Sequence, residues 1–265
     1  YGSNVFVPWE IGVVMEGRPC TKEEESVAMS ANPRMKPLER KVLRDTVYES
    51  LVDMLMSGTL APGASLSIDG LASGLAVSPT PVREALVHLE RTGLVFREPL
   101  RGYRVAPLLD TDQVAQLCDA RAIVELGALE LAFQNADDLA DDLAKALVAH
   151  AEVAKAVAGI PPDPAAIGAF RGYATADWEF HHAIFRHSGN TYLLSVADSL
   201  PMHLHRLRQS VTRGVHDAEA SVAEHAEVLR AVQDGDLEQA RRAMRTHLAN
   251  VKERSLSETT PDAAG

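Results

Sequence analysis

Four side chains in the second half of the sequence have the chemistry to bind a metal ion together. Asp177 and His181 are four residues apart, so in a helix they lie one above the other on one face. His225 and His247 follow, 22 residues apart, in two further segments with helical spacing. One carboxylate and three imidazoles suit Zn, Ni, Mn or Fe better than Ca or Mg. A single Asp-x-x-x-His pair is also common on helix surfaces, so the spacing alone leaves both interpretations open.

Length and composition predict two mainly helical domains. The 265 residues exceed the usual size of one domain, and 46% of them are apolar, enough for a sizeable core. The net charge of −11 argues against a general nucleic-acid binder, but the charge is uneven. Residues 36–105 contain nine basic and eight acidic side chains, so this segment can have a basic surface although the whole protein is acidic.

Cysteine usage and hydropathy predict a cytoplasmic protein without a membrane partner. Cys20 and Cys118 form no CxxC pair, which fits a reducing compartment. No apolar run is long enough to span a bilayer, and Pro8 and Glu10 interrupt the first apolar stretch, so no signal peptide is expected. Residues 1–35 lack a clear period and are expected to form an irregular arm, with Met29 and Met35 as alternative starts.

Residues 36–107 have the pattern of a winged helix-turn-helix. A helix over 38–57 and a short helix over 68–75 precede a second short helix that starts near Ser78. Ser78 or Thr80 can cap this helix, and Pro81 fits its first turn. We expect its apolar stripe to consist of Val82, Leu86 and Val87, completed by Leu94. Two alternating segments, 95–99 and 102–105, then predict a hairpin with the basic tip 100–102.

Residues 108–257 are predicted to form an all-helical domain, and 258–265 a mobile tail. The expected helices cover 110–135, 137–158, 165–188, 193–211, 217–233 and 237–257. The predicted fold class is therefore mainly α, an N-terminal winged helix-turn-helix followed by a helical bundle.

The first domain resembles the DNA-binding domain of GntR-family transcription regulators. The resemblance is carried by Leu71-Ala72, by the run from Val77 to Leu86, and by Gly93-Leu94-Val95. It implies that the helix near Thr80 enters the major groove and that the wing reaches the minor groove. The residues it assigns to DNA are Ser78, Thr80, Arg83, Arg101 and Gly102. Pro79 stands where the family usually has Arg, and Gly70 where some members carry a DNA-contacting Arg.

The second domain resembles the FCD-type ligand-binding bundle of the FadR-like branch of that family. The matching stretches are 121–125, 177–181, 188–190 and 225–232, followed by Gly235-Asp236, Ala240, Met244 and His247. The resemblance implies a divalent metal held by Asp177, His181, His225 and His247. A small carboxylate or hydroxy acid would bind at the metal. The effector-binding residues expected with it are Arg121, Asn190, His203 and Arg206.

These expectations describe a transcription regulator, a repressor rather than an enzyme, that binds double-stranded operator DNA as a homodimer. Glu125 is expected to position Arg121, and His182 to point about 100° away from His181. Two alternatives stay open. One is a DNA-binding protein with a purely structural metal and no effector. The other is a metal-dependent hydrolase, although no paired nucleophile and base is visible.

Overall fold

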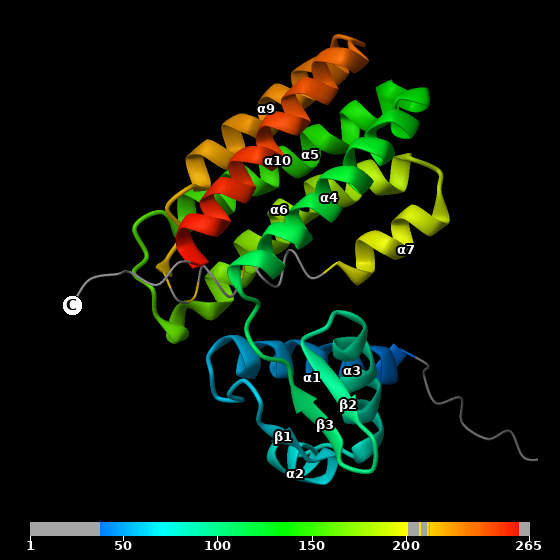
Figure 1. Cartoon of the computed structure of the whole chain (residues 1–265). Helices are drawn as coiled ribbons and strands as arrows, with labels where there is room; N and C mark the ends of the chain where they lie inside the picture. The colour runs from blue at the N-terminus through cyan, green and yellow to red at the C-terminus, as the bar shows by residue number, and fades with distance from the viewer. Residues whose placement is uncertain (1–37, 201–206, 208–210, 212, 260–265) are drawn as a thin grey trace, which may run out of the picture. The chain divides into compact units, whose positions relative to one another are not determined.

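The computed structural model describes residues 38–200, 207, 211 and 213–259, and it confirms the predicted fold class. The first part is a winged helix-turn-helix and the second is a set of helices (Figure 1). The elements of the first part are α1 (Leu38–Met56), β1 (Ser65–Leu66), α2 (Ile68–Gly74), α3 (Pro79–Arg91), β2 (Val95–Glu98) and β3 (Gly102–Val105).

The three strands form one antiparallel sheet in the order β1-β3-β2. In the hairpin of the wing, Val95 pairs with Val105 and Glu98 with Gly102. Leu100 and Gly102, on either side of Arg101, adopt positive φ angles of 64° and 87°. The tight turn requires this conformation, which glycine adopts without strain. The turn exposes Leu100 and Arg101 at the tip of the wing.

Helix α3 has one buried face and one face exposed to solvent. Val82, Leu86 and Leu89 are fully buried, at the i, i+4 and i+7 spacing of one helix face. The prediction that Val87 belongs to this stripe was wrong, because Val87 is 46% exposed. Val87 follows Val82 by five residues, which turns it about 140° away from the buried face.

The second part is helical throughout most of its described residues. Its helices are α4 (Thr111–Ala132), α5 (Ala136–Val157), α6 (Ile167–His187), α7 (Thr191–Ser199), α9 (Ala218–Gln233) and α10 (Leu237–Thr259), with 3-10 turns over Phe133–Asn135 and Pro164–Ala166. Helix α5 packs between α6 and α9, and α4 packs against α6 and α10 (Figure 1). The prediction of one helix over 193–211 was wrong, because α7 ends at Ser199 and Leu200 is extended, as residues before a proline tend to be. Much of the rest of that range lies outside the described residues.

Local sequence signals set the ends of these helices. Asp110 and Gln113 form a reciprocal capping box at the start of α4. Gly189, with a φ of 64°, follows the end of α6, and the side chain of Asn190 then accepts hydrogen bonds from the backbone of Tyr192 and Leu193. None of the described helices combines the length and apolar character needed to cross a membrane.

Candidate functional site

Three histidines from three different helices meet inside the helical part. His181 on α6, His225 on α9 and His247 on α10 are each at most 1% exposed. The Nε2 atoms of His181 and His225 are 3.1 Å apart, and His247 Nε2 lies 3.3 Å from each of them. The fold therefore brings together three of the four predicted metal ligands, atom against atom.

Carboxylates hold the outward nitrogens of two of these histidines. His181 Nδ1 lies 2.7 Å from Glu125 Oε2, and His247 Nδ1 lies 2.7 Å from Glu224 Oε2. Because a carboxylate only accepts, each imidazole places its proton on Nδ1 and keeps a lone pair on Nε2. Such outer partners are the usual companions of histidines that bind metals.

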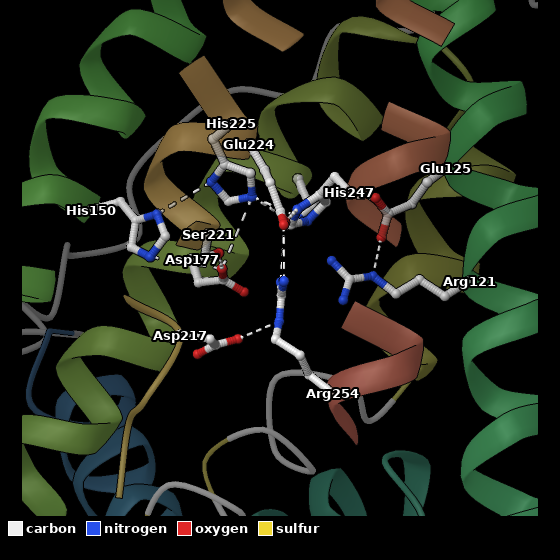
Figure 2. Close-up of polar contacts among 11 residues, drawn as sticks. Arg121, Glu125, His150, Asp177, Asp217, Ser221, Glu224, His225, His247 and Arg254 are labelled. Carbon is white, nitrogen blue, oxygen red and sulfur yellow. Dashed lines mark hydrogen bonds and ion pairs between the residues drawn. The ribbon is translucent and has the colours of Figure 1, made fainter. Parts of the chain in front are cut away.

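The third histidine has a different outer partner. His225 Nδ1 lies 3.2 Å from Nδ1 of His150, a fully buried histidine on α5 (Figure 2). The ring of Phe180 stacks on the His225 ring, with centroids 4.1 Å apart and planes within 4° of parallel. Stacking fixes the plane of the His225 ring, and the contact with His150 marks the edge that faces away from the other two imidazoles.

The gap between His181 and His247 fits a cation better than a hydrogen bond. His181 and His247 both direct an Nε2 lone pair at the other, so neither can donate a hydrogen bond across that gap. A metal–nitrogen bond of about 2.0–2.1 Å separates neighbouring ligand atoms by about 2.9 Å in octahedral and about 3.4 Å in tetrahedral geometry. The observed separations of 3.1 and 3.3 Å lie between these two values.

The two carboxylates are charged at neutral pH. Burial raises the pKa of Glu125, but the charge of Arg121 and the hydrogen bonds from His181 and Arg121 outweigh burial and lower that pKa to about 2. Burial likewise raises the pKa of Glu224, and hydrogen bonds led by that from His247 lower it to about 2. Ionised partners of this kind strengthen the imidazoles as electron donors.

Two of the histidines, His225 and His247, are held in the neutral form that a metal requires. Burial lowers the pKa of His247 to about 4, although its hydrogen bond to Glu224 acts in the opposite direction. Burial, together with the nearby His247 and His181, lowers the pKa of His225 well below its ordinary value of 6.5. At neutral pH both rings can offer lone pairs without first losing a proton.

Asp177, the fourth predicted ligand, lies beside the three imidazoles. Its Oδ1 is 4.0 Å from His225 Nε2, accepts a hydrogen bond from Ser221 Oγ at 3.1 Å and lies 3.7 Å from His150 Nε2. Asp177, His150 and His225 form a second set of possible ligands, with one atom each within 4.8 Å. The two sets share His225.

Arg121 is buried next to this cluster. Its side chain is 4% exposed, and its Nε donates a hydrogen bond to Glu125, which in turn contacts His181. Glu125 was predicted to position Arg121; it contacts both Arg121 and the candidate ligand His181. Arg121 Nη2 is buried without a hydrogen-bond partner among the described residues. Figure 2 shows the guanidinium group pointing toward the middle of the cluster.

Sequence reasoning missed several residues around the site. Arg254 pairs with Glu224 at 2.8 Å and with Asp217 at 2.8 Å (Figure 2). The side-chain amide of Asn250 also donates a hydrogen bond to Glu224. His150 was missed as well. The contacts of Glu224 with His247, Asn250 and Arg254 span 23 to 30 residues, so no helical spacing signals them.

The other residues predicted to bind the effector either lie outside the described residues or have a different role. His203 and Arg206 lie outside the described residues. Asn190 caps α7 through its side-chain oxygen, a structural role that the effector prediction did not include. His182 contacts Asp198 and Arg186 on the partly exposed side of α6 and takes no part in the cluster of imidazoles.

The winged helix presents its predicted DNA-binding residues to solvent. Ser78 is the N-cap of α3 without a side-chain capping bond, and Thr80 and Arg83 are exposed in its first turns. Arg83 and Arg101 line a hollow between α3 and the wing together with Arg97, which sequence reasoning missed. Its other lining residues are Ser65, Leu66, Ser67, Ile68, Val87, Gly102 and Tyr103. The hollow therefore has three cationic side chains and no acidic one among its described lining residues.

Comparison with known proteins accounts for both parts. Residues 43–105 match the model of bacterial regulatory proteins of the gntR family, and residues 116–250 match that of the FCD domain. A transcriptional regulator from an unstable DNA locus of Streptomyces ambofaciens is 35% identical over 225 residues, which span 78% of this chain and 83% of that protein. The chain belongs to the GntR family and carries an FCD domain. It is thus a member of a family of transcription regulators, not of enzymes.

More distant relatives of this GntR protein include named repressors. The HTH-type transcriptional repressor NanR of Escherichia coli K12 is 26% identical over 250 residues, covering 86% of this chain and 90% of that protein. A probable D-xylose utilization operon repressor of Paenarthrobacter nicotinovorans is 28% identical over 214 residues, covering 81% and 89%. The solved structure of E. coli McbR/YncC, 22% identical, has a similar fold, with a TM-score of 0.63 over 82% of this chain and 99% of that one.

Proposed function

We propose that this GntR regulator is a metal-containing repressor whose affinity for operator DNA is controlled by a small carboxylic or hydroxy acid. The observation that carries the proposal is the meeting of three Nε2 atoms at 3.1–3.3 Å, in rings whose other nitrogens all have outer partners. Membership of the GntR family supports the regulatory function. The histidine cluster would hold the metal at which the acid binds.

His181, His225 and His247 would hold one divalent ion, Zn, Ni, Mn or Fe, with Asp177 as the fourth ligand. The charge around the cluster supports a dication. Four carboxylates (Glu125, Asp177, Asp217 and Glu224) face two guanidinium groups (Arg121 and Arg254), which leaves two negative charges for a divalent ion to neutralise. When bound, the ion supplies open coordination positions for an oxygen of the effector.

Arg121 would bind the carboxylate of that effector. Its Nη2 is a buried donor without a partner among the described residues, and a guanidinium group matches a carboxylate in shape and charge. Arg121 is connected through Glu125 to His181, so an acid on Arg121 acts on the same network as the ion. The acid would thus make one contact with the protein and one with the metal.

The winged helix would bind the operator with Ser78, Thr80 and Arg83 in the major groove and Arg101 and Gly102 at the minor groove. The cationic hollow between α3 and the wing supports this assignment and adds Arg97. Two copies of the chain, as a homodimer, would bind two half-sites about one helical turn apart. Repression is the sense suggested by the names of the repressors among its relatives.

The effector acts by binding one arrangement of the regulator better than another. The expected coupling is about 1–3 kcal/mol of operator affinity, the usual range for allosteric effectors. A mobility-shift titration with the protein's own upstream DNA tests it, with acetate, lactate, succinate and citrate as probes. Each probe is tested with metal-loaded and chelator-treated protein.

Arg121→Lys separates the role of the guanidinium from that of its charge. Lysine keeps a cation beside buried Glu125 but removes Nη2, so the response to acid should disappear while operator binding without acid is retained. Arg245→Lys, an exposed arginine two residues before His247, is the matched control and should respond like wild type. A response that survives both Arg121→Lys and removal of the metal contradicts the proposal. If no probe changes operator affinity while the metal stays bound, the metal has a structural role instead.

A further inference from the structure

The three clustered histidines differ in what holds their outer nitrogen. Glu125 and Glu224 are carboxylates, 2.7 Å from His181 Nδ1 and His247 Nδ1. The partner of His225 is another imidazole, His150, at 3.2 Å. A carboxylate can only accept a hydrogen bond, whereas a neutral imidazole has one donor and one acceptor nitrogen. The state of His225 therefore depends on which nitrogen of His150 carries the proton.

Metal binding removes that ambiguity. If His225 binds the ion through Nε2, its proton is on Nδ1, which points at His150 Nδ1. His150 Nδ1 must then be the acceptor, and the His150 proton lies on Nε2. That nitrogen faces Asp177 Oδ1 at 3.7 Å, so the same tautomer directs its N–H toward the fourth candidate ligand.

We propose that His150 is a positioning residue of the metal centre. By accepting the Nδ1–H of His225, it selects the tautomer and ring orientation in which His225 Nε2 faces His181 and His247. The inference rests on the proposed metal site and assigns a role to a residue outside the four predicted ligands. It makes α5 a contributor to the centre, although α5 carries none of those four ligands.

The surroundings of His150 support a specific role for its nitrogen. The side chain is fully buried, and its ring lies 5.1 Å from the ring of Tyr173 and 5.1 Å from that of His225. The stacking of Phe180 on His225 fixes the plane of that ring but not which edge faces the metal. The hydrogen bond to His150 supplies the missing choice.

Two substitutions distinguish the acceptor from simple packing. His150→Phe keeps an aromatic ring but removes the acceptor, and His150→Asn retains an acceptor near the position of Nδ1. Zn²⁺ affinity, measured by chelator competition, should fall about 10–100-fold in His150→Phe, the usual loss for an outer partner of a metal ligand. The visible spectrum of bound Co²⁺ should change with it. His150→Asn should stay close to wild type in both measurements.

His187→Phe is the matched control, because His187 lies on α6 and contacts Asp142 instead of the cluster. It should bind Zn²⁺ like wild type. Equal affinity and an unchanged Co²⁺ spectrum in His150→Phe would overturn the proposal, as would equal losses in the Phe and Asn variants. Two Zn²⁺ per wild-type chain and one in His150→Phe would also overturn it, by making His150 a ligand of a second ion. A wild-type chain that binds no Zn²⁺ would overturn the metal site itself, which distinguishes the two failures.

A measurement on the wild-type protein reports the tautomers directly and needs a variant only to assign one signal. In the Zn²⁺-loaded chain labelled with ¹⁵N-histidine, long-range ¹H–¹⁵N spectra report the tautomer of each ring. His150, identified by the signal missing from His150→Asn, should carry its proton on Nε2, and His225 on Nδ1. A proton on His150 Nδ1 would contradict the assignment.

Discussion

The two parts of this GntR regulator place their functional side chains in opposite environments. In the winged helix, Arg83, Arg97 and Arg101 are exposed around a hollow without acidic neighbours among the described residues. In the FCD domain, His225 and Arg121 are buried. The difference shows that the first surface is free to bind a large anion, whereas the second site consists of buried or partly buried charged groups that contact one another. Substitutions should therefore affect binding alone in the first part, and binding and stability together in the second.

The largest expected effect separates two adjacent histidines on α6. His181→Ala removes one of three converging ligands and should weaken Zn²⁺ binding by more than about a hundredfold, beyond the loss typical of outer partners. His182→Ala removes a partly exposed neighbour and should change the binding free energy by less than about 0.5 kcal/mol. Chelator competition measures both. Similar losses in the two variants would mean that the cluster does not bind the ion.

The next effect compares a buried ion pair with a partly exposed one. Glu125→Gln leaves Arg121 charged and uncompensated in the interior, so it should cost about 3–5 kcal/mol of stability. Glu98→Gln breaks a pair with Arg104 on the wing whose side chains are 28% and 31% exposed, and it should cost less than about 1 kcal/mol. Urea unfolding followed by circular dichroism gives both values. Equal costs would remove the contrast between the two parts.

A smaller effect is expected on operator affinity, without a change in stability. Arg83→Ala should weaken operator binding by about 1–3 kcal/mol if its guanidinium group reaches a base. Because Arg83 is exposed, the unfolding midpoint should stay within the narrow range of surface substitutions. Mobility shift and urea unfolding are measured on the same preparation. A loss of stability comparable to that of Glu125→Gln would show that Arg83 supports the fold instead.

The smallest effect is a change in salt dependence. Arg101 at the tip of the wing should contact a phosphate, so Arg101→Ala should reduce the slope of log affinity against log salt by about one unit. Lys252→Ala, which removes a cation that pairs with Asp119 in the FCD domain, is the control and should leave the slope unchanged. An unaltered slope in Arg101→Ala would place the wing away from the DNA backbone.

Sequence patterns predicted the features that arise from residues close to one another in the chain. The helix-turn-helix and the Asp177/His181 pair follow from spacings of a few residues, and the meeting of His225 and His247 with that pair was implied by the family resemblance. The outer partners could not be predicted, because His150 is 75 residues from His225 and Glu125 is 56 from His181. Asn190 shows the opposite case, since its capping of α7 is a local signal that its family position obscured.

X-ray anomalous scattering from crystals of the Zn²⁺-loaded protein tests the central claim most directly. Data collected on either side of the zinc absorption edge should show one strong peak per chain in the FCD domain. We expect that peak to lie about 2.0–2.1 Å from the Nε2 atoms of His181, His225 and His247. No peak at that position, or a zinc ion held by surface residues such as His182 and Asp198 instead, would contradict the account.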